Sequence, residues 1–164
     1  MPDVRAKKTF ILIYNNLLYQ HAETENSLFQ FLLLYSVECY DIDTDLWRLV
    51  SPLVERRSGA GAASLNEYVY AIGGYNGDAQ LSSVERYDPT LDTWTVTSPL
   101  IHRRSALSAT VLLNKLYVVG GYDGEGFLST LEEYFPEEDC WKLVSSMNLG
   151  RSGAGIAVGW KPAM

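Results

Sequence analysis

The stretch Tyr68–Tyr75 reads YVYAIGGY, and 47 residues later the stretch Lys115–Tyr122 reads KLYVVGGY. The same interval separates Trp47 from Trp94 and Trp94 from Trp141, with no insertion. A fixed period of roughly 20–50 residues is typical of one supersecondary unit that is copied along a chain. The other residues that recur at this interval are Glu38, Glu85 and Glu132; Tyr40, Tyr87 and Tyr134; and the Arg-Ser pairs that begin at Arg57, Arg104 and Arg151. The sequence therefore predicts a repeat protein.

Each unit is predicted to form four short strands. The segment Tyr68–Ile72 is rich in β-branched and aromatic residues, which favour strands. Turn residues such as Asn76-Gly77-Asp78 and Asp88-Pro89 separate the segments. The strands expected in the first complete unit are Ser58–Leu65, Tyr68–Ile72, Ser83–Tyr87 and Thr93–Thr97, and those in the second are Ser105–Leu112, Leu116–Val119, Thr130–Tyr134 and Trp141–Val144. No window shows the helical period, so the chain is predicted to be all-β.

Four strands in every 47 residues, marked by Gly-Gly, Tyr and Trp, resemble a blade of the kelch type of β-propeller. The predicted fold is a kelch-type β-propeller fragment, with two complete four-stranded blades plus parts of two others. The expected segments are an atypical N-terminal segment with a degenerate repeat (1–34), the outer strands of a partial blade (35–57), two blades (58–104 and 105–151), and the inner strand of a closing blade with a tail (152–164).

The incomplete parts carry specific expectations. The partial blade is expected to hold strands Val37–Tyr40 and Trp47–Val50, and the closing blade is expected to hold one lone inner strand, Gly153–Val158. In the atypical segment, Asn16–Tyr19 looks like a second strand that is shifted four places from the repeat. We interpret this segment as the mark of a truncated or misjoined product. Open sheet edges at both ends predict a marginal or oligomeric chain.

The composition is that of a globular, acidic chain. Hydrophobic residues make up 47% and charged residues 20%, which argues against disorder. The net charge of −7 gives no electrostatic attraction to nucleic acid or to an anionic membrane. Cys39 and Cys140 form no metal-type or redox-type pair, and His21 and His102 are too few for a metal site. No cofactor or metal is expected, and the expected location is the cytoplasm, with the nucleus as a second location.

The predicted topology places two kinds of loop on one face of the blades. Strand direction alternates in an antiparallel meander, so the connection that enters a blade and the connection between its second and third strands share a face. The first kind carries the Arg-Ser pairs, and the second comprises Tyr75–Gln80 and Tyr122–Phe127. Loops on a rigid scaffold concentrate binding residues. Hydroxyls, an amide and aromatic rings near arginines suit an acidic peptide, because hydroxyls and arginines bind carboxylates.

The sequence also resembles the kelch domain of BTB–kelch proteins over residues 36–158, in register. The narrowest matches are His102–Leu107, which reads HRRSAL, and Gly121–Leu128, which reads GYDGEGFL. The likeness is to the oxidative-stress adaptors of a cullin ubiquitin ligase, and it implies a pocket for the acidic degron of a cap'n'collar bZIP transcription factor. The resemblance assigns peptide binding to Ser58, Tyr75, Gln80, Ser105, Tyr122, Phe127 and Ser152.

The sequence departs from that family in two respects. Nothing in it resembles the BTB and BACK domains, so cullin binding is expected only through domains that this sequence does not contain. The arginines that other blades of the family bring to the pocket also have no counterpart. Family-type binding is therefore expected to be weaker, because hydrogen bonds to charged groups contribute about 1.5–3 kcal/mol each.

Several assignments stay open. Arg57, Arg104 and Arg151 either bond backbone carbonyls between blades or contact a ligand, and their recurrence in every unit favours the first interpretation. The acidic residues Glu132-Glu133 and Glu137–Asp139 are interpreted as a solvated outer edge. The functional alternatives are a kelch receptor for a different protein, such as actin, and a propeller oxidase. The oxidase is disfavoured because the sequence lacks the cluster of His, Tyr and Cys ligands that it requires.

Overall fold

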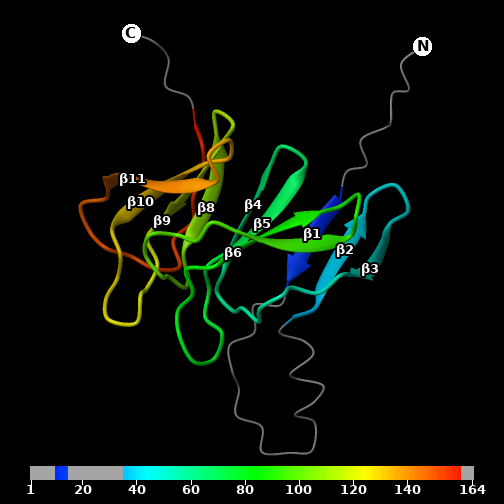
Figure 1. The fold of residues 1–164 in the computed structure, drawn as a ribbon, viewed down its shortest axis with the longest axis horizontal. Coiled ribbons are helices and arrows are strands. Elements are labelled where there is room, and N and C mark those ends of the chain that lie inside the picture. Colours follow the sequence, from blue (N-terminus) through cyan, green and yellow to red (C-terminus); the bar gives the residue numbers. More distant parts are fainter. Residues whose placement is uncertain (1–9, 15–34, 160–164) are drawn as a thin grey trace, which may run out of the picture.

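Three antiparallel sheets stand side by side in the computed structural model, which describes residues 10–14 and 35–159 (Figure 1). The strands are β1 (Phe10–Tyr14), β2 (Val37–Asp41), β3 (Leu46–Val50), β4 (Gly61–Leu65), β5 (Tyr68–Ile72), β6 (Val84–Asp88), β7 (Thr93–Thr97), β8 (Ser108–Leu112), β9 (Lys115–Val119), β10 (Thr130–Phe135) and β11 (Cys140–Ser146). The sheet orders are β1–β2–β3, β4–β5–β6–β7 and β8–β9–β10–β11. Each sheet is therefore an up-and-down meander, and each forms one blade.

The all-β prediction and the two four-stranded blades are confirmed. The described residues contain no helix, and so none that could cross a membrane. The first strand of each complete blade is shorter than predicted, because β4 begins at Gly61 and β8 begins at Ser108. Gly59 has a φ of 58° and Ala106 has a φ of 49°. Such left-handed residues interrupt an extended chain, so each blade enters by a separate short bridge before its first strand.

The sequence before residue 35 contributes a strand, β1, that the repeat analysis did not predict. β1 pairs with β2 so that Tyr14 lies opposite Val37, just as Ile72 lies opposite Val84 in the next blade. β1 therefore occupies the position of the second strand. One period before Tyr68 is residue 21, and β1 begins 11 positions earlier, at Phe10. The fragment Asn16–Tyr19 lies outside the described residues.

The predicted inner strand Gly153–Val158 is not formed. The Gly153 N–H donates to the Ala106 carbonyl at 2.8 Å, and the Ser108 hydroxyl bonds the Ala154 carbonyl. No ladder follows, because no described strand lies on the far side of this segment to pair with it. A β-strand is defined by such pairing, so the residue pattern alone does not produce one.

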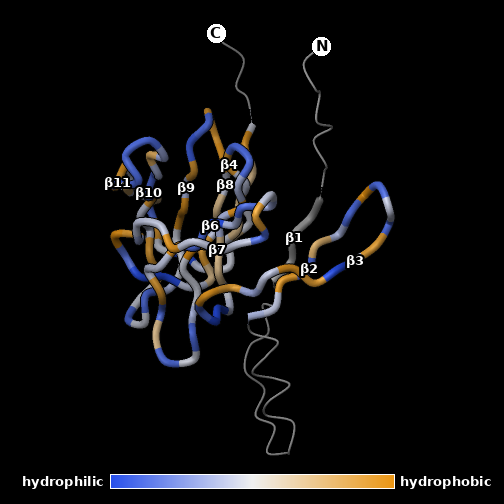
Figure 2. The backbone as a smooth tube through the Cα atoms, turned by 45° about the vertical axis from the view of Figure 1, so that its right-hand side comes forward, coloured by the Kyte–Doolittle hydropathy of each residue, from blue (hydrophilic) through white to orange (hydrophobic). Residues whose placement is uncertain are grey.

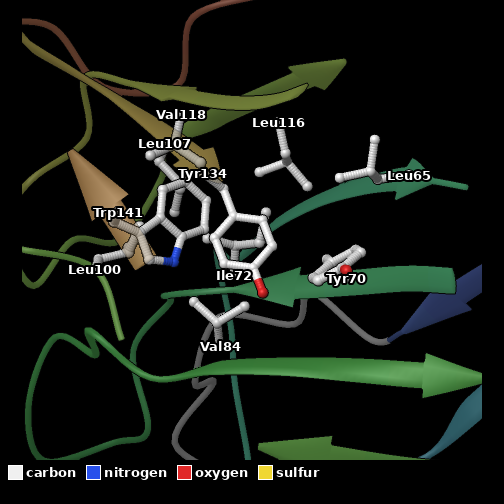
Figure 3. Close-up of a cluster of buried hydrophobic side chains, with 10 residues drawn as sticks. All are labelled: Leu65, Tyr70, Ile72, Val84, Leu100, Leu107, Leu116, Val118, Tyr134 and Trp141. Carbon is white, nitrogen blue, oxygen red and sulfur yellow. The ribbon is translucent and has the colours of Figure 1, made fainter. Parts of the chain in front are cut away.

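The core lies between the sheets, in two clusters. The larger cluster joins the second and third sheets, with Tyr70 and Val84 facing Tyr134 and Trp141 (Figure 3). The Tyr70 and Tyr134 rings meet edge to face, with centroids 5.7 Å apart. The smaller cluster joins the first two sheets and includes Cys39, which is packed as a small apolar residue. Face-to-face burial therefore holds neighbouring blades together, and each blade depends on the blade beside it.

A polar clamp fixes the outer strands of neighbouring blades. Asp92 accepts the Ser51 N–H at 2.9 Å, and the Trp94 indole N–H donates to the Ser51 carbonyl at 2.9 Å. The Ser51 N–H and the Tyr87 hydroxyl hold the pKa of the Asp92 carboxyl below its usual value, because both donate to the charged form. In the same way, Asp139 accepts the Ser98 N–H at 3.1 Å, and the Trp141 indole N–H donates to the Ser98 carbonyl at 3.1 Å. The recurring Asp and Trp thus join blades.

A buried ion pair closes each complete blade. Arg57 and Glu85 are both fully buried, with 2.8 Å between Nη2 and Oε1, and Arg57 also donates to the Gly73 and Ser83 carbonyls at 2.8 and 2.9 Å. Arg57 is the residue just before blade 58–104 and these acceptors lie in that blade, so Arg57 bonds backbone carbonyls where the chain enters the blade, which favours the first interpretation. Glu85 further accepts the N–H groups of Val54 and Glu55 at 2.6 and 3.0 Å. The Arg side chain is architectural, as its recurrence favoured.

The second complete blade repeats this arrangement. Arg104 pairs with Glu132, and both side chains are fully buried. The interpretation of Glu132-Glu133 as a solvated edge is therefore wrong. Glu132 neutralises a buried guanidinium, and Glu133 is covered by Lys115 at 2.6 Å and by the Tyr117 hydroxyl at 3.0 Å. Glu137–Asp139 are exposed, as interpreted.

Candidate functional site

The blade start and the loop after the second strand are joined residue to residue on one rim. Ser58 and Tyr75 exchange backbone hydrogen bonds of 2.9 and 2.8 Å, and Tyr75 forms a second bridge to Gln80. The Ser58 hydroxyl donates to the Tyr75 carbonyl at 3.3 Å, which is a long bond. The structure therefore brings Ser58, Tyr75 and Gln80 together on this rim.

The second complete blade presents the same trio of positions. Ser105 bridges Tyr122, and Tyr122 bridges Phe127. The Tyr122 and Phe127 rings pack with centroids 5.7 Å apart, and the Phe127 side chain is 65% exposed. The Phe127 ring is therefore packed against Tyr122 on one side and open to solvent on the other.

The two trios meet at Gly124. A side chain placed on Gly124 would lie 2.7 Å from Gln80 Oε1, so the Gln80 amide packs directly over this part of the next blade's loop. Gly124 has a φ of 103°, and the Asp123 side chain accepts the N–H groups of Glu125 and Gly126 at 2.8 Å each. These two donors hold the pKa of the Asp123 carboxyl below its usual value. The loop that faces Gln80 is therefore a preformed turn.

A pocket of about 580 Å³ opens between the two blade starts. Its lining residues are Ser58, Gly59, Ala60, Tyr75, Gln80, Ser105, Ala106, Leu107, Gly153 and Ala154. Four of the seven residues that sequence analysis assigned to peptide binding are on this lining. Tyr122 and Phe127 belong to the adjoining loop outside the lining, and Ser152 is exposed beside it. The small and apolar residues, such as Leu107, were not predicted because nothing in their type signals a site.

Two exposed ion pairs flank this rim and were also missed. Arg56 pairs with Asp78 at 2.9 Å, and Arg103 pairs with Glu125 at 3.3 Å. Both pairs join residues 22 apart, and the two pairs are one period apart. That spacing is the sequence signal that could have revealed them. The arginines nearest the rim therefore already hold carboxylates of the chain itself, whereas Arg57 and Arg104 are buried inside their blades.

The described residues contain no group of three or more His, Cys, Asp or Glu side chains arranged to hold a metal ion. The Nδ1 atom of His102 lies 3.3 Å from Oε1 of Glu132, and the same carboxylate oxygen accepts a hydrogen bond from Arg104. What the rim offers is hydroxyls, one amide and aromatic rings around a pocket. This chemistry suits the binding of a polar chain segment.

Comparison with known proteins identifies the repeat. The kelch motif matches residues 56–101 and 103–148, which together make up more than half of the chain. This chain belongs to the kelch-repeat family. The solved structure of YjhT shares its fold, with a TM-score of 0.66 at 16% identity over 73% of this chain and 48% of that chain. The predicted kelch-type propeller fragment is thereby confirmed.

Curated kelch-repeat relatives match shorter stretches. Human Kelch-like protein 3 is 48% identical over 42 residues, which is 26% of this chain and 7% of the relative. Mouse Kelch-like protein 1 is 44% identical over 50 residues, covering 30% and 7% of the two chains. The influenza virus NS1A-binding protein homolog of Xenopus laevis is 41% identical over 44 residues, covering 27% and 7%. The match thus spans a small part of each relative's length.

Proposed function

We propose that the rim pocket binds an extended acidic segment of a partner protein, as a non-catalytic recognition module. The observation that supports this most directly is the joining of Ser58, Tyr75 and Gln80 by successive backbone bridges beside Ser105. Four side chains from two blades thus converge on one pocket. Hydroxyl and amide donors there can bind carboxylates, and the aromatic rings supply apolar area.

The finer proposal follows the sequence resemblance. The seven assigned residues are those expected for an adaptor similar to the Kelch-like ECH-associated protein, so the proposed ligand is the acidic degron of a cap'n'collar bZIP transcription factor. The matches to Kelch-like proteins 1 and 3 favour a second candidate, a kelch receptor for a different protein.

Titration of the 164-residue chain with an acidic peptide of the Glu-Thr-Gly-Glu type tests the proposal. We expect saturable binding that Tyr75→Ala and Ser105→Ala each weaken about tenfold or more, since residues in a desolvated pocket dominate affinity. Ser64→Ala, an exposed serine on β4 outside the pocket, is the matched control and should leave binding unchanged. Equal affinity for all three variants would contradict the proposed site.

A second variant tests the charge chemistry. Glu125→Gln removes the carboxylate that Arg103 holds, and Arg103 is 53% exposed in its side chain. An acidic peptide then no longer competes with Glu125. We expect affinity to rise by up to about fivefold, because an exposed ion pair contributes about 0–1 kcal/mol.

Saturable binding of filamentous actin, with no binding of the acidic peptide, would instead favour the second candidate.

A further inference from the structure

The two buried Arg–Glu pairs have the same sequence spacing. The series also contains a glutamate, Glu38, and an arginine, Arg151, that have no ion-pair partner within the described residues. Arg57 and Glu85 are 28 residues apart, as are Arg104 and Glu132. Arg151 is the next arginine in the series, but it is exposed and has no ion-pair partner among residues 10–14 and 35–159. Glu38 is the glutamate of the first blade, and position 10, where its arginine would stand, is Phe.

Glu38 occupies the same place in its blade as the buried glutamates do in theirs. It lies on β2 opposite Leu49, just as Glu85 lies on β6 opposite Val96. Yet Glu38 is exposed and makes no ion pair within the described part of the chain. The molecule therefore carries half of a buried Arg–Glu pair at each end, with opposite charges.

The polar clamp is unmatched in the same way. Asp45 and Trp47 stand one period before Asp92 and Trp94, but Trp47 is 49% exposed and its indole N–H meets no acceptor among the described residues. Ser51 and Ser98 are the serines that an Asp–Trp pair binds inside the molecule. The next serine in this series is Ser145, at the other end of the molecule, and it is exposed. Figure 2 shows the β2–β3 hairpin extending into solvent with hydrophobic stretches, which agrees with this open surface.

The outer faces of the first and third sheets resemble the two sides of the interface between the second and third sheets. In the second sheet, four side chains that cover the third sheet are fully buried: Leu65, Tyr70, Ile72 and Val84. Their counterparts one period later, on the far face of the third sheet, are only partly buried: Leu112, Tyr117, Val119 and Leu131. What covers such a face inside the molecule is a Tyr–Trp pair of the next blade, and Tyr40 and Trp47 present that pair, with ring centroids 5.1 Å apart.

The backbone completes this correspondence. Within the described part of the chain, the first sheet has three strands and β1 is its inner edge. The segment Gly153–Val158 leaves the third sheet as Ala106–Val111 leaves the second, since the Gly121 N–H donates to the Arg151 carbonyl at 2.8 Å just as the Gly74 N–H donates to the Arg104 carbonyl at 2.8 Å. Among the described residues, a segment with the sequence of an inner strand thus lacks a sheet, and the first sheet lacks an inner strand.

We propose that two copies of this chain associate head to tail, so that residues 153–158 of each copy complete the first sheet of the other. Arg151 of one copy then pairs with Glu38 of the second copy. Asp45 and Trp47 of the second copy form hydrogen bonds with Ser145 of the first. A head-to-tail interface either closes into a ring or grows into a filament. Propellers close with about 4–8 blades, and two copies of the three described sheets fall in that range, whereas one copy or three copies do not.

Sedimentation of the 164-residue chain over a range of concentrations tests the assembly. We expect a dimer of twice 18.4 kDa and no larger species. Glu38→Arg and Arg151→Glu should each weaken dimerisation by about a hundredfold or more, because each variant places like charges together at both buried interfaces. Glu67→Arg makes the same charge change on an exposed turn and is the matched control, with no effect expected.

Mixing the two charge variants gives the decisive result. A Glu38→Arg chain and an Arg151→Glu chain restore an opposite pair at both interfaces, one native and one reversed. We expect the mixture to form a heterodimer although each variant alone is monomeric, and this recovery shows that both variants are folded. A wild-type monomer at high concentration, growing polymers, or a mixture that stays monomeric would each overturn the proposal.

Discussion

At the scale of single residues, the buried Arg–Glu pair is the feature on which each blade depends most. Arg57 alone ties together Gly73, Ser83 and Glu85, which come from the loop and the third strand of one blade. A buried charge is costly unless it is paired, so removing one partner leaves the other without compensation. Recurrence of these residues is thus explained by stability, and their spacing fixes where the pocket residues next to them lie.

Glu85→Gln tests this role. The variant keeps the shape of the side chain but leaves the Arg57 guanidinium without a countercharge, so we expect the free energy of unfolding to fall by about 3 kcal/mol. Denaturant unfolding followed by circular dichroism measures it. Glu67→Gln, on an exposed turn, should change stability by less than about 0.5 kcal/mol. Two variants of equal stability would mean that the buried pair contributes nothing.

The sequence analysis found these residues but not all of their roles. Recurrence at 47 residues favoured an architectural role for Arg57 and showed that Glu85 recurs in the same register, because repetition is visible in the sequence. It could not show that Glu132 is buried, since a glutamate beside Glu133 looks like a solvated surface until its distant arginine is placed. The seven binding residues were assigned by resemblance, and their binding role stays a prediction. The positions of Leu107 and the small residues in the pocket become visible only in the folded structure, because their residue types do not indicate a binding site.

At the scale of elements, the Gly-Gly pair sets how closely neighbouring blades approach. Gly73 has a φ of 59°, and a Cβ built on it would lie 2.6 Å from the Arg104 carbonyl oxygen, where the chain enters the next blade. Gly120 repeats this contact against the Arg151 carbonyl oxygen. The glycine therefore ends the second strand where the backbone that enters the adjacent blade passes.

Gly73→Ala should separate the two blades. The methyl group must displace a backbone carbonyl, and the left-handed conformation adds strain of about 1–3 kcal/mol, so we expect stability to fall by at least that amount. Thermal unfolding measures the loss. Gly126→Ala has open space around its Cβ and is the matched control, expected to be neutral or slightly stabilising. Similar melting temperatures for the two variants would refute the close approach.

Two elements differ from the prediction, since β1 was missed and the inner strand Gly153–Val158 is not formed. β1 could not be found by period, because 22 residues separate Tyr14 from Val37 whereas 11 separate Ile72 from Val84. The segment Gly153–Val158 has the residues of an inner strand but no described neighbour on which to form a ladder. Periodicity therefore predicts which residues can form a strand, and long-range pairing decides whether they do.

At the scale of the whole molecule, stability is distributed unequally among the three sheets. Each sheet contacts only its neighbours, so the middle sheet is covered on both faces and the outer sheets on one. In the middle sheet Ala71 and Val84 are completely buried, whereas Leu46 and Leu49 on β3 are 65% and 70% exposed. In such nearest-neighbour assemblies, local opening is easiest at the ends.

Hydrogen exchange measured strand by strand tests this gradient. We expect amides of β5 and β6 to exchange at least about 100-fold more slowly than those of β3, because β5 and β6 are paired on both sides between two covered faces. The head-to-tail dimer adds a second expectation, since association covers the first sheet. Protection in β2 should therefore rise with protein concentration while that in β5 stays constant. Uniform exchange across the sheets would contradict the gradient, and protection in β2 that is independent of concentration would contradict the dimer.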